Sequence, residues 1–107
     1  MAFEKIAEIA RVEQQEKQLL VVPQMKTLAY QAAIDMVEAL VDEGGVAKQN
    51  VTIDLQEVHI IDSMAMGQFI ILKEKMAGRV LSLTNVNSTI RKVLSMSQLD
   101  QVLRVVD

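Results

Sequence analysis

The segment "HIIDSMAMGQF", residues 59–69, decides the fold class, because an apolar strand-like run passes directly into an amphipathic helix. The polar pair Asp62-Ser63 separates the two apolar parts, where a helix N-cap is expected. A helix is predicted over residues 63–77, ended by Gly78, since glycine is favoured just past a helix C-terminus. Its core face is expected to hold Ala65, Phe69, Leu72 and Met76.

Short apolar runs on both sides of this junction predict the other strands. Buried strands are expected at Gln18–Pro23 and at residues 50–55, 79–85 and 102–106. Residues 57–62, "EVHIID", are expected to form an extended lead-in to the helix.

Two further helices are predicted from apolar residues at helical spacing. One runs from about Met25 to Glu43 and is ended by Gly44-Gly45. The other is capped by Asn87 or Ser88. Its inward residues are expected to be Ile90, Val93 and Leu94, and Ser97 with Asp100 resembles a capped final turn.

The alternation of strands and helices predicts one α/β domain over residues 1–107, with right-handed crossovers. The expected sheet is mixed but largely parallel, with four to five strands packed with about four helices. The first dozen residues fit two structures. One is a helical stripe, and the other is a hairpin partner for Gln18–Pro23; the stripe would hold Phe3, Ile6, Ala7 and Ala10.

Composition favours a cytoplasmic protein with an aliphatic core. Half of the 107 residues are hydrophobic, but only 3% are aromatic, and there is no cysteine. No apolar run reaches the roughly 18 residues that a membrane span needs, and the charged N-terminal stretch is unlike a secretory signal. The net charge is -3, and the 11 basic residues are scattered, so nucleic-acid binding is not expected.

Few residues could support catalysis. The only histidine, His59, is expected to be held by packing and one hydrogen bond. A triad of His59 with Ser63 lacks a second oxyanion donor, and a metal site would depend on dispersed carboxylates. No cofactor is expected, because Gly44-Gly45 lacks the Lys-Ser/Thr of a phosphate loop. An enzyme using His59 and Asp62 is the least favoured hypothesis.

The pair Asp62-Ser63 supports two compatible interpretations. Either side chain could cap the helix, which contributes about 1 kcal/mol. A phosphate on Ser63 would also be tolerated at a helix N-terminus, and it would add about two negative charges to the surface. Met64, Met66 and Ile71 lie off the core face; they either form a contact surface or widen the buried stripe.

The order of these motifs resembles the STAS domain of anti-sigma factor antagonists. The similarity rests on strand "VTIDL", extended "EVHIID", Ser63, and Gly67 four residues later. It continues through "AGRVLSLTNVNSTIRKVLSMSQLDQVLRVVD", so it covers residues 50–107 well and the N-terminal half loosely. Two departures are clear. Met64-Ala65 replaces the usual Ser/Thr-Gly, and "PQMKT" replaces an early Gly-x-Leu-Asp segment.

The resemblance implies a phosphorylation-controlled switch. Ser63 would be the phosphoacceptor of a GHKL-type serine kinase, which is often also the anti-sigma factor, and a serine phosphatase would reverse the modification. The resemblance implies partner contacts by Asp62, Met64, Met66, Gly67 and Ile71. The alternative is a non-phosphorylated STAS scaffold subunit of a signalling or transport complex.

Overall fold

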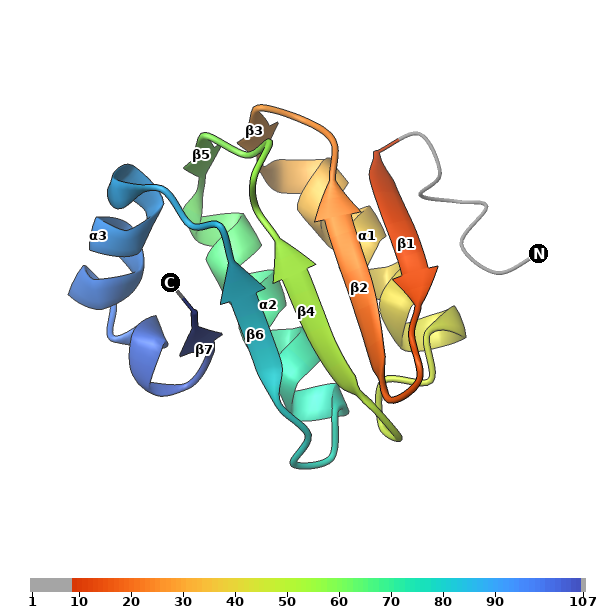
Figure 1. The fold of residues 1–107 in the computed structure, drawn as a ribbon. Helices are drawn as coiled ribbons and strands as arrows, with labels where there is room; N and C mark the ends of the chain where they lie inside the picture. Colours follow the sequence, from red (N-terminus) through yellow and green to blue (C-terminus); the bar gives the residue numbers. More distant parts are fainter. Residues whose placement is uncertain (1–8, 107) are drawn as a thin grey trace.

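The computed structural model describes residues 9–106 and contains a five-stranded sheet in the order β1-β2-β4-β6-β7 (Figure 1). The pairs β2–β4, β4–β6 and β6–β7 are parallel, and only β1–β2 is antiparallel. The predicted mixed, largely parallel sheet is therefore confirmed. The strands are β1 (Ala10–Gln14), β2 (Gln18–Pro23), β4 (Asn50–Asp54), β6 (Leu81–Thr84) and β7 (Arg104–Val105).

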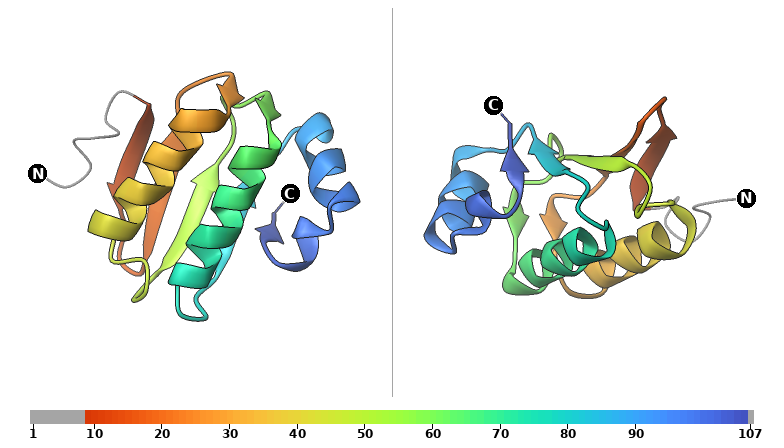
Figure 2. Two further views of the ribbon diagram at one scale, coloured as in Figure 1. Left: turned by 180° about the vertical axis from the view of Figure 1, so that it is seen from behind. Right: turned by 90° about the horizontal axis from the view of Figure 1, so that it is seen from below.

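Two helices cover one face of the sheet. Helices α1 (Tyr30–Glu43) and α2 (Ser63–Lys75) lie side by side against it (Figure 2). Helix α3 (Ser88–Met96) and the short 3-10 helix η2 (Leu99–Gln101) lie at the β7 edge. The described residues thus form three α-helices and one 3-10 turn, rather than about four helices.

The core lies between the sheet and the helix pair, and it is aliphatic apart from Phe69. The predicted inner face of α2 is confirmed, because Ala65, Phe69, Leu72 and Met76 are all fully buried. They face alternate buried positions of the parallel strands. These strand positions include Val51 and Ile53 of β4 and Leu81 and Leu83 of β6.

The prediction that the first helix starts near Met25 is wrong, because α1 starts at Tyr30. Residues Thr27–Leu28 instead form strand β3, which pairs in parallel with β5 (Ile60–Ile61). Leu28 is fully buried as a residue of β3, not as part of a helix. The end of α1 is as expected, since Gly44 is its C-cap and Gly45 has a positive φ of 58°.

The predicted cap at Ser97 is also wrong. The Ser97 hydroxyl donates to the carbonyl oxygens of Val93 and Leu94 in the preceding turn. Gln98, in the left-handed conformation, leads into η2 instead. The last strand is shorter than predicted, and Val93 is only half-buried.

The N-terminal ambiguity is resolved for the described residues in favour of the hairpin. Strand β1 pairs with β2, and Val12 lies opposite Val21. Ala10 is buried within this hairpin. The helical stripe predicted for Phe3, Ile6 and Ala7 lies outside the described residues.

Candidate functional site

A short two-stranded sheet brings the starts of α1 and α2 together. Strand β3 precedes α1, strand β5 precedes α2, and the two strands pair at the end of the main sheet (Figure 1). The carbonyl oxygen of Lys26 accepts hydrogen bonds from the backbone N–H groups of His59 and Ile60, at 2.7 and 3.1 Å. The extended lead-in predicted before the helix therefore contains the two-residue strand β5, which is held by its pairing with β3 from an earlier part of the chain.

Asp62 is the residue that caps α2. Its Oδ1 accepts a hydrogen bond of 2.8 Å from the backbone N–H of Ala65. Its Oδ2 accepts a second one of 3.3 Å from the backbone N–H of Tyr30, the first residue of α1. One carboxylate therefore satisfies orphan amides at two helix N-termini, where the helix dipoles also favour a negative charge.

Because Asp62 supplies the cap, the hydroxyl of Ser63 is not needed for it. Ser63 is the first residue of α2, and its side chain is exposed. Within the part of the chain that the structure describes, this hydroxyl forms no hydrogen bond. The two capping candidates of the sequence thus have different surroundings: Asp62 is engaged and Ser63 is free.

The apolar residues around Ser63 divide between two sides of α2. Met64 and Ile71 are 39% and 42% exposed. Met66 is half-buried and packs against the core, and its Sδ lies 3.8 Å from the Ser97 Oγ at the end of α3. Met66 therefore lies at the α3 border of the site, whereas Met64 and Ile71 face solvent.

Gly67 lies one helical turn after Ser63 on the outer side of α2. A Cβ atom placed there would have no neighbour within 4 Å, so no packing requires a glycine. Glycine in a helix interior costs roughly 0.5–1 kcal/mol relative to alanine. Because Gly67 has no side chain, the surface next to Ser63 stays open to an approaching partner.

Two further exposed residues lie at this site, and the sequence did not indicate either of them. Tyr30 is 72% exposed and Ile60 is 54% exposed. Tyr30 also has a positive φ of 46°, a conformation that is rare for a bulky residue and that is held by its bond to Asp62. No sequence signal marks either residue, because their position depends on the pairing of β3 with β5.

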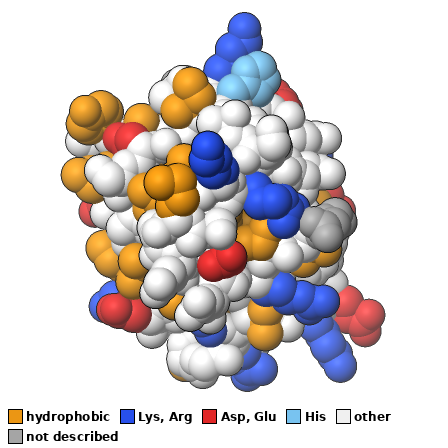
Figure 3. All heavy atoms as spheres, turned by 90° about the vertical axis from the view of Figure 1, so that its left-hand side faces the viewer, with side chains coloured by type: hydrophobic (Ala, Val, Ile, Leu, Met, Phe, Trp, Pro, Cys, Tyr) orange, Lys and Arg blue, Asp and Glu red, His pale blue; other side chains and the backbone are white. Residues whose placement is uncertain are grey.

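The expectation that His59 is held by packing is wrong. Its side chain is exposed; only its backbone is fixed, by the N–H bond to Lys26 and by a 3.0 Å bond from Asn87 Nδ2 to its carbonyl oxygen. Figure 3 shows the single histidine at the top of the α3 side of the molecule. Several hydrophobic side chains lie on the surface in the same view. Met96, the last residue of α3, and Val102, just after η2, are among the large exposed hydrophobic residues.

Two kinds of feature are absent from residues 9–106. No group of three or more His, Asp or Glu side chains is arranged to hold a metal ion. No helix in that range has both the length and the apolar character that a membrane crossing requires.

Comparison with known proteins gives a consistent result. TM1081 of Thermotoga maritima, a candidate anti-sigma factor antagonist, has a similar structure with a TM-score of 0.81 at 20% identity, over 92% of this chain and 86% of that one. The anti-sigma factor antagonist SpoIIAA in its unphosphorylated form gives 0.75 at 13% identity, over 92% and 88%. The phosphorylated form of SpoIIAA from Bacillus gives 0.64 at 18% identity, over 92% and 91%.

No curated protein matches the chain by sequence. The family model of the STAS domain matches residues 7–107, and the strand order and helix placement above agree with it. The chain belongs to the STAS domain family.

Proposed function

We propose that this STAS domain is a partner-switching module of the anti-sigma factor antagonist type, controlled by phosphorylation of Ser63. One observation carries the proposal: Asp62 caps α2 with its own carboxylate and leaves the neighbouring Ser63 hydroxyl exposed and unbonded within the described residues. Such a hydroxyl can be modified without loss of a helix cap.

The proposed contact surface consists of Ser63, Met64, Gly67 and Ile71, with Asp62 and Met66 at its borders. Met64 and Ile71 offer exposed apolar area, and Gly67 allows close approach of a partner. A phosphate on Ser63 would add about two negative charges to this surface, beside the carboxylate of Asp62. Burying that charge against an apolar partner is costly, so phosphorylation releases the partner while the core stays intact.

The partner chemistry follows from the family. The unphosphorylated chain would bind a GHKL-type serine kinase that also acts as an anti-sigma factor, and a serine phosphatase would restore this form. In this proposal the protein works in the cytoplasm and supplies no catalytic base of its own. The two solved forms of SpoIIAA, phosphorylated and unphosphorylated, support a switch of this kind.

Phosphate mapping on the protein from its own cells tests the proposal. Tryptic cleavage after Lys48 and Lys73 gives a peptide, residues 49–73, whose only hydroxyl side chains are Thr52 and Ser63. We expect phosphate on Ser63 whose amount changes between growth and stress. An unmodified peptide under every condition, from folded protein, would favour the scaffold hypothesis.

Helix α3 offers a matched control for partner binding. Ser88 is also an exposed first residue of a helix, and the preceding Asn87 accepts a 2.8 Å bond from the Ile90 N–H, as Asp62 does from Ala65. Ser63→Glu should abolish capture of the partner kinase, whereas Ser88→Glu should not. Equal loss in both variants would show that added charge, rather than the site, is responsible.

A further inference from the structure

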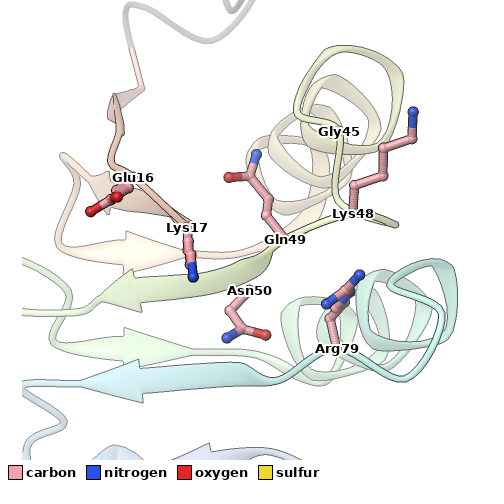
Figure 4. Close-up of a pocket in the computed structure, with 7 residues that line it drawn as sticks. All are labelled: Glu16, Lys17, Gly45, Lys48, Gln49, Asn50 and Arg79. Atoms are coloured by element: carbon pink, nitrogen blue, oxygen red, sulfur yellow. The ribbon is translucent and has the colours of Figure 1, made fainter.

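A pocket lined by charged and amide side chains lies at the end of the sheet where β2, β4 and β6 begin (Figure 4). Its volume is about 660 Å³. Three connections that are far apart in the sequence form it: the β1–β2 turn, the loop between α1 and β4, and the turn between α2 and β6. These connections meet because the parallel strands they enter all start at this edge.

Each connection supplies one cation to the pocket. These are Lys17, Lys48 and Arg79, and the protein as a whole carries a net charge of -3. Among the described residues, Glu16 is the only carboxylate that lines the pocket, and in Figure 4 its side chain points away from Arg79. In Figure 4 the Lys48 side chain points away from Lys17 and Arg79, and no carboxylate of residues 9–106 is paired with any of the three cations.

The two amide side chains of the pocket are oriented by other contacts. Asn50 Oδ1 accepts a 3.0 Å hydrogen bond from the Val80 N–H, which leaves the Asn50 amide NH₂ free to donate. Gln49 is fixed in the wall, since its Nε2 donates to the Gly44 carbonyl at 2.6 Å. The described lining therefore offers mainly donors, namely the Lys17 ammonium, the Arg79 guanidinium and the Asn50 amide NH₂, while the Lys48 ammonium points outward.

We propose that this pocket binds a small soluble anion that carries two phosphate groups or one phosphate on a polar body, such as a sugar phosphate. Charged donors from separate loops suit phosphate oxygens, because charge-assisted hydrogen bonds are the strong ones. The described lining contains no aromatic or large apolar side chain on which a nucleobase could stack. The site is separate from Ser63, so the proposal is independent of the phosphorylation switch.

Titration of the ¹⁵N-labelled protein with inorganic pyrophosphate tests the site. We expect saturable amide shifts confined to the three connections around Lys17, Asn50 and Arg79. The double variant Lys17→Gln/Arg79→Gln should bind at least about tenfold more weakly, since it removes two charged donors. The control Lys26→Gln/Lys92→Gln removes the same charge from two exposed lysines outside the pocket, and it should bind as the parent does.

Four outcomes would overturn the proposal. Shifts spread evenly over the exposed lysines, or equal weakening in both double variants, would show only general attraction of an anion. Absence of saturation at millimolar pyrophosphate would show that no site exists. Binding to phosphatidylcholine vesicles doped with phosphatidic acid, without competition from pyrophosphate or glucose 6-phosphate, would identify a lipid surface as the ligand.

Discussion

Replacing Gly67 by alanine should stabilise the protein and at the same time weaken partner binding. The added Cβ meets no atom within 4 Å, and the residue lies inside α2, so the helix gains the usual advantage of alanine over glycine. That advantage is about 0.5–1 kcal/mol. For a domain of this size it corresponds to a rise in melting temperature of about 2–4 °C. The same methyl group would stand between Ser63 and an approaching partner.

Gly78 provides the matched control for the stability measurement. A Cβ there also meets nothing within 4 Å, but the φ of 84° is one that alanine adopts only with strain. Gly78→Ala should therefore lower the free energy of unfolding by about 1 kcal/mol or more. Urea unfolding at equal m-values measures both changes.

Two results would refute this reasoning about Gly67. Destabilisation by Gly67→Ala would mean that the outer side of α2 is not open as described. Stabilisation together with unchanged affinity for the partner kinase, measured by calorimetry, would mean that the partner does not approach this side of α2.

Three further predictions concern the same helix. Asp62→Ala removes the carboxylate that accepts hydrogen bonds at the N-termini of both helices. It should lower the free energy of unfolding, measured in urea, by about 1–2 kcal/mol and speed hydrogen exchange at the Tyr30 amide. Unchanged exchange there would show that the link between the helices has no energetic role. Met64→Glu should change stability by less than about 0.5 kcal/mol but abolish kinase binding, because the side chain is 39% exposed; loss of the fold would instead place Met64 in the core. Phe69→Ala, at a fully buried position, should lower the free energy of unfolding by about 3–5 kcal/mol. A loss under about 1 kcal/mol would contradict the burial of Phe69 in the core.

The sequence alone was enough to place α2 and the main-sheet strands β2, β4 and β6. The spacing of Ala65, Phe69, Leu72 and Met76 identified the core face of α2 correctly. Strand β2 was predicted with its observed bounds, Gln18–Pro23. These features are local: a repeat of hydrophobic residues determines which face is buried, whatever the element packs against.

Features that depend on contacts between segments far apart in the sequence could not be predicted from local spacing. The start of α1 was misplaced because Thr27–Leu28 is held as a strand by Ile60–Ile61, and this pairing outweighs the local helical spacing. His59 was expected inside because its neighbours are apolar, yet the β3–β5 pair leaves its side chain exposed.

The sequence by itself determined that a helix starts at the Asp62-Ser63 pair and that one of the two residues caps it. Tertiary structure alone decided which one, because the Asp62 carboxylate reaches both Ala65 and the Tyr30 amide, and the second contact exists only once α1 and α2 lie side by side. In the same way, only folding brings Lys17, Lys48 and Arg79 to one pocket. Hydrophobic periodicity encodes the elements, whereas the site depends on side chains that meet only after the chain has folded.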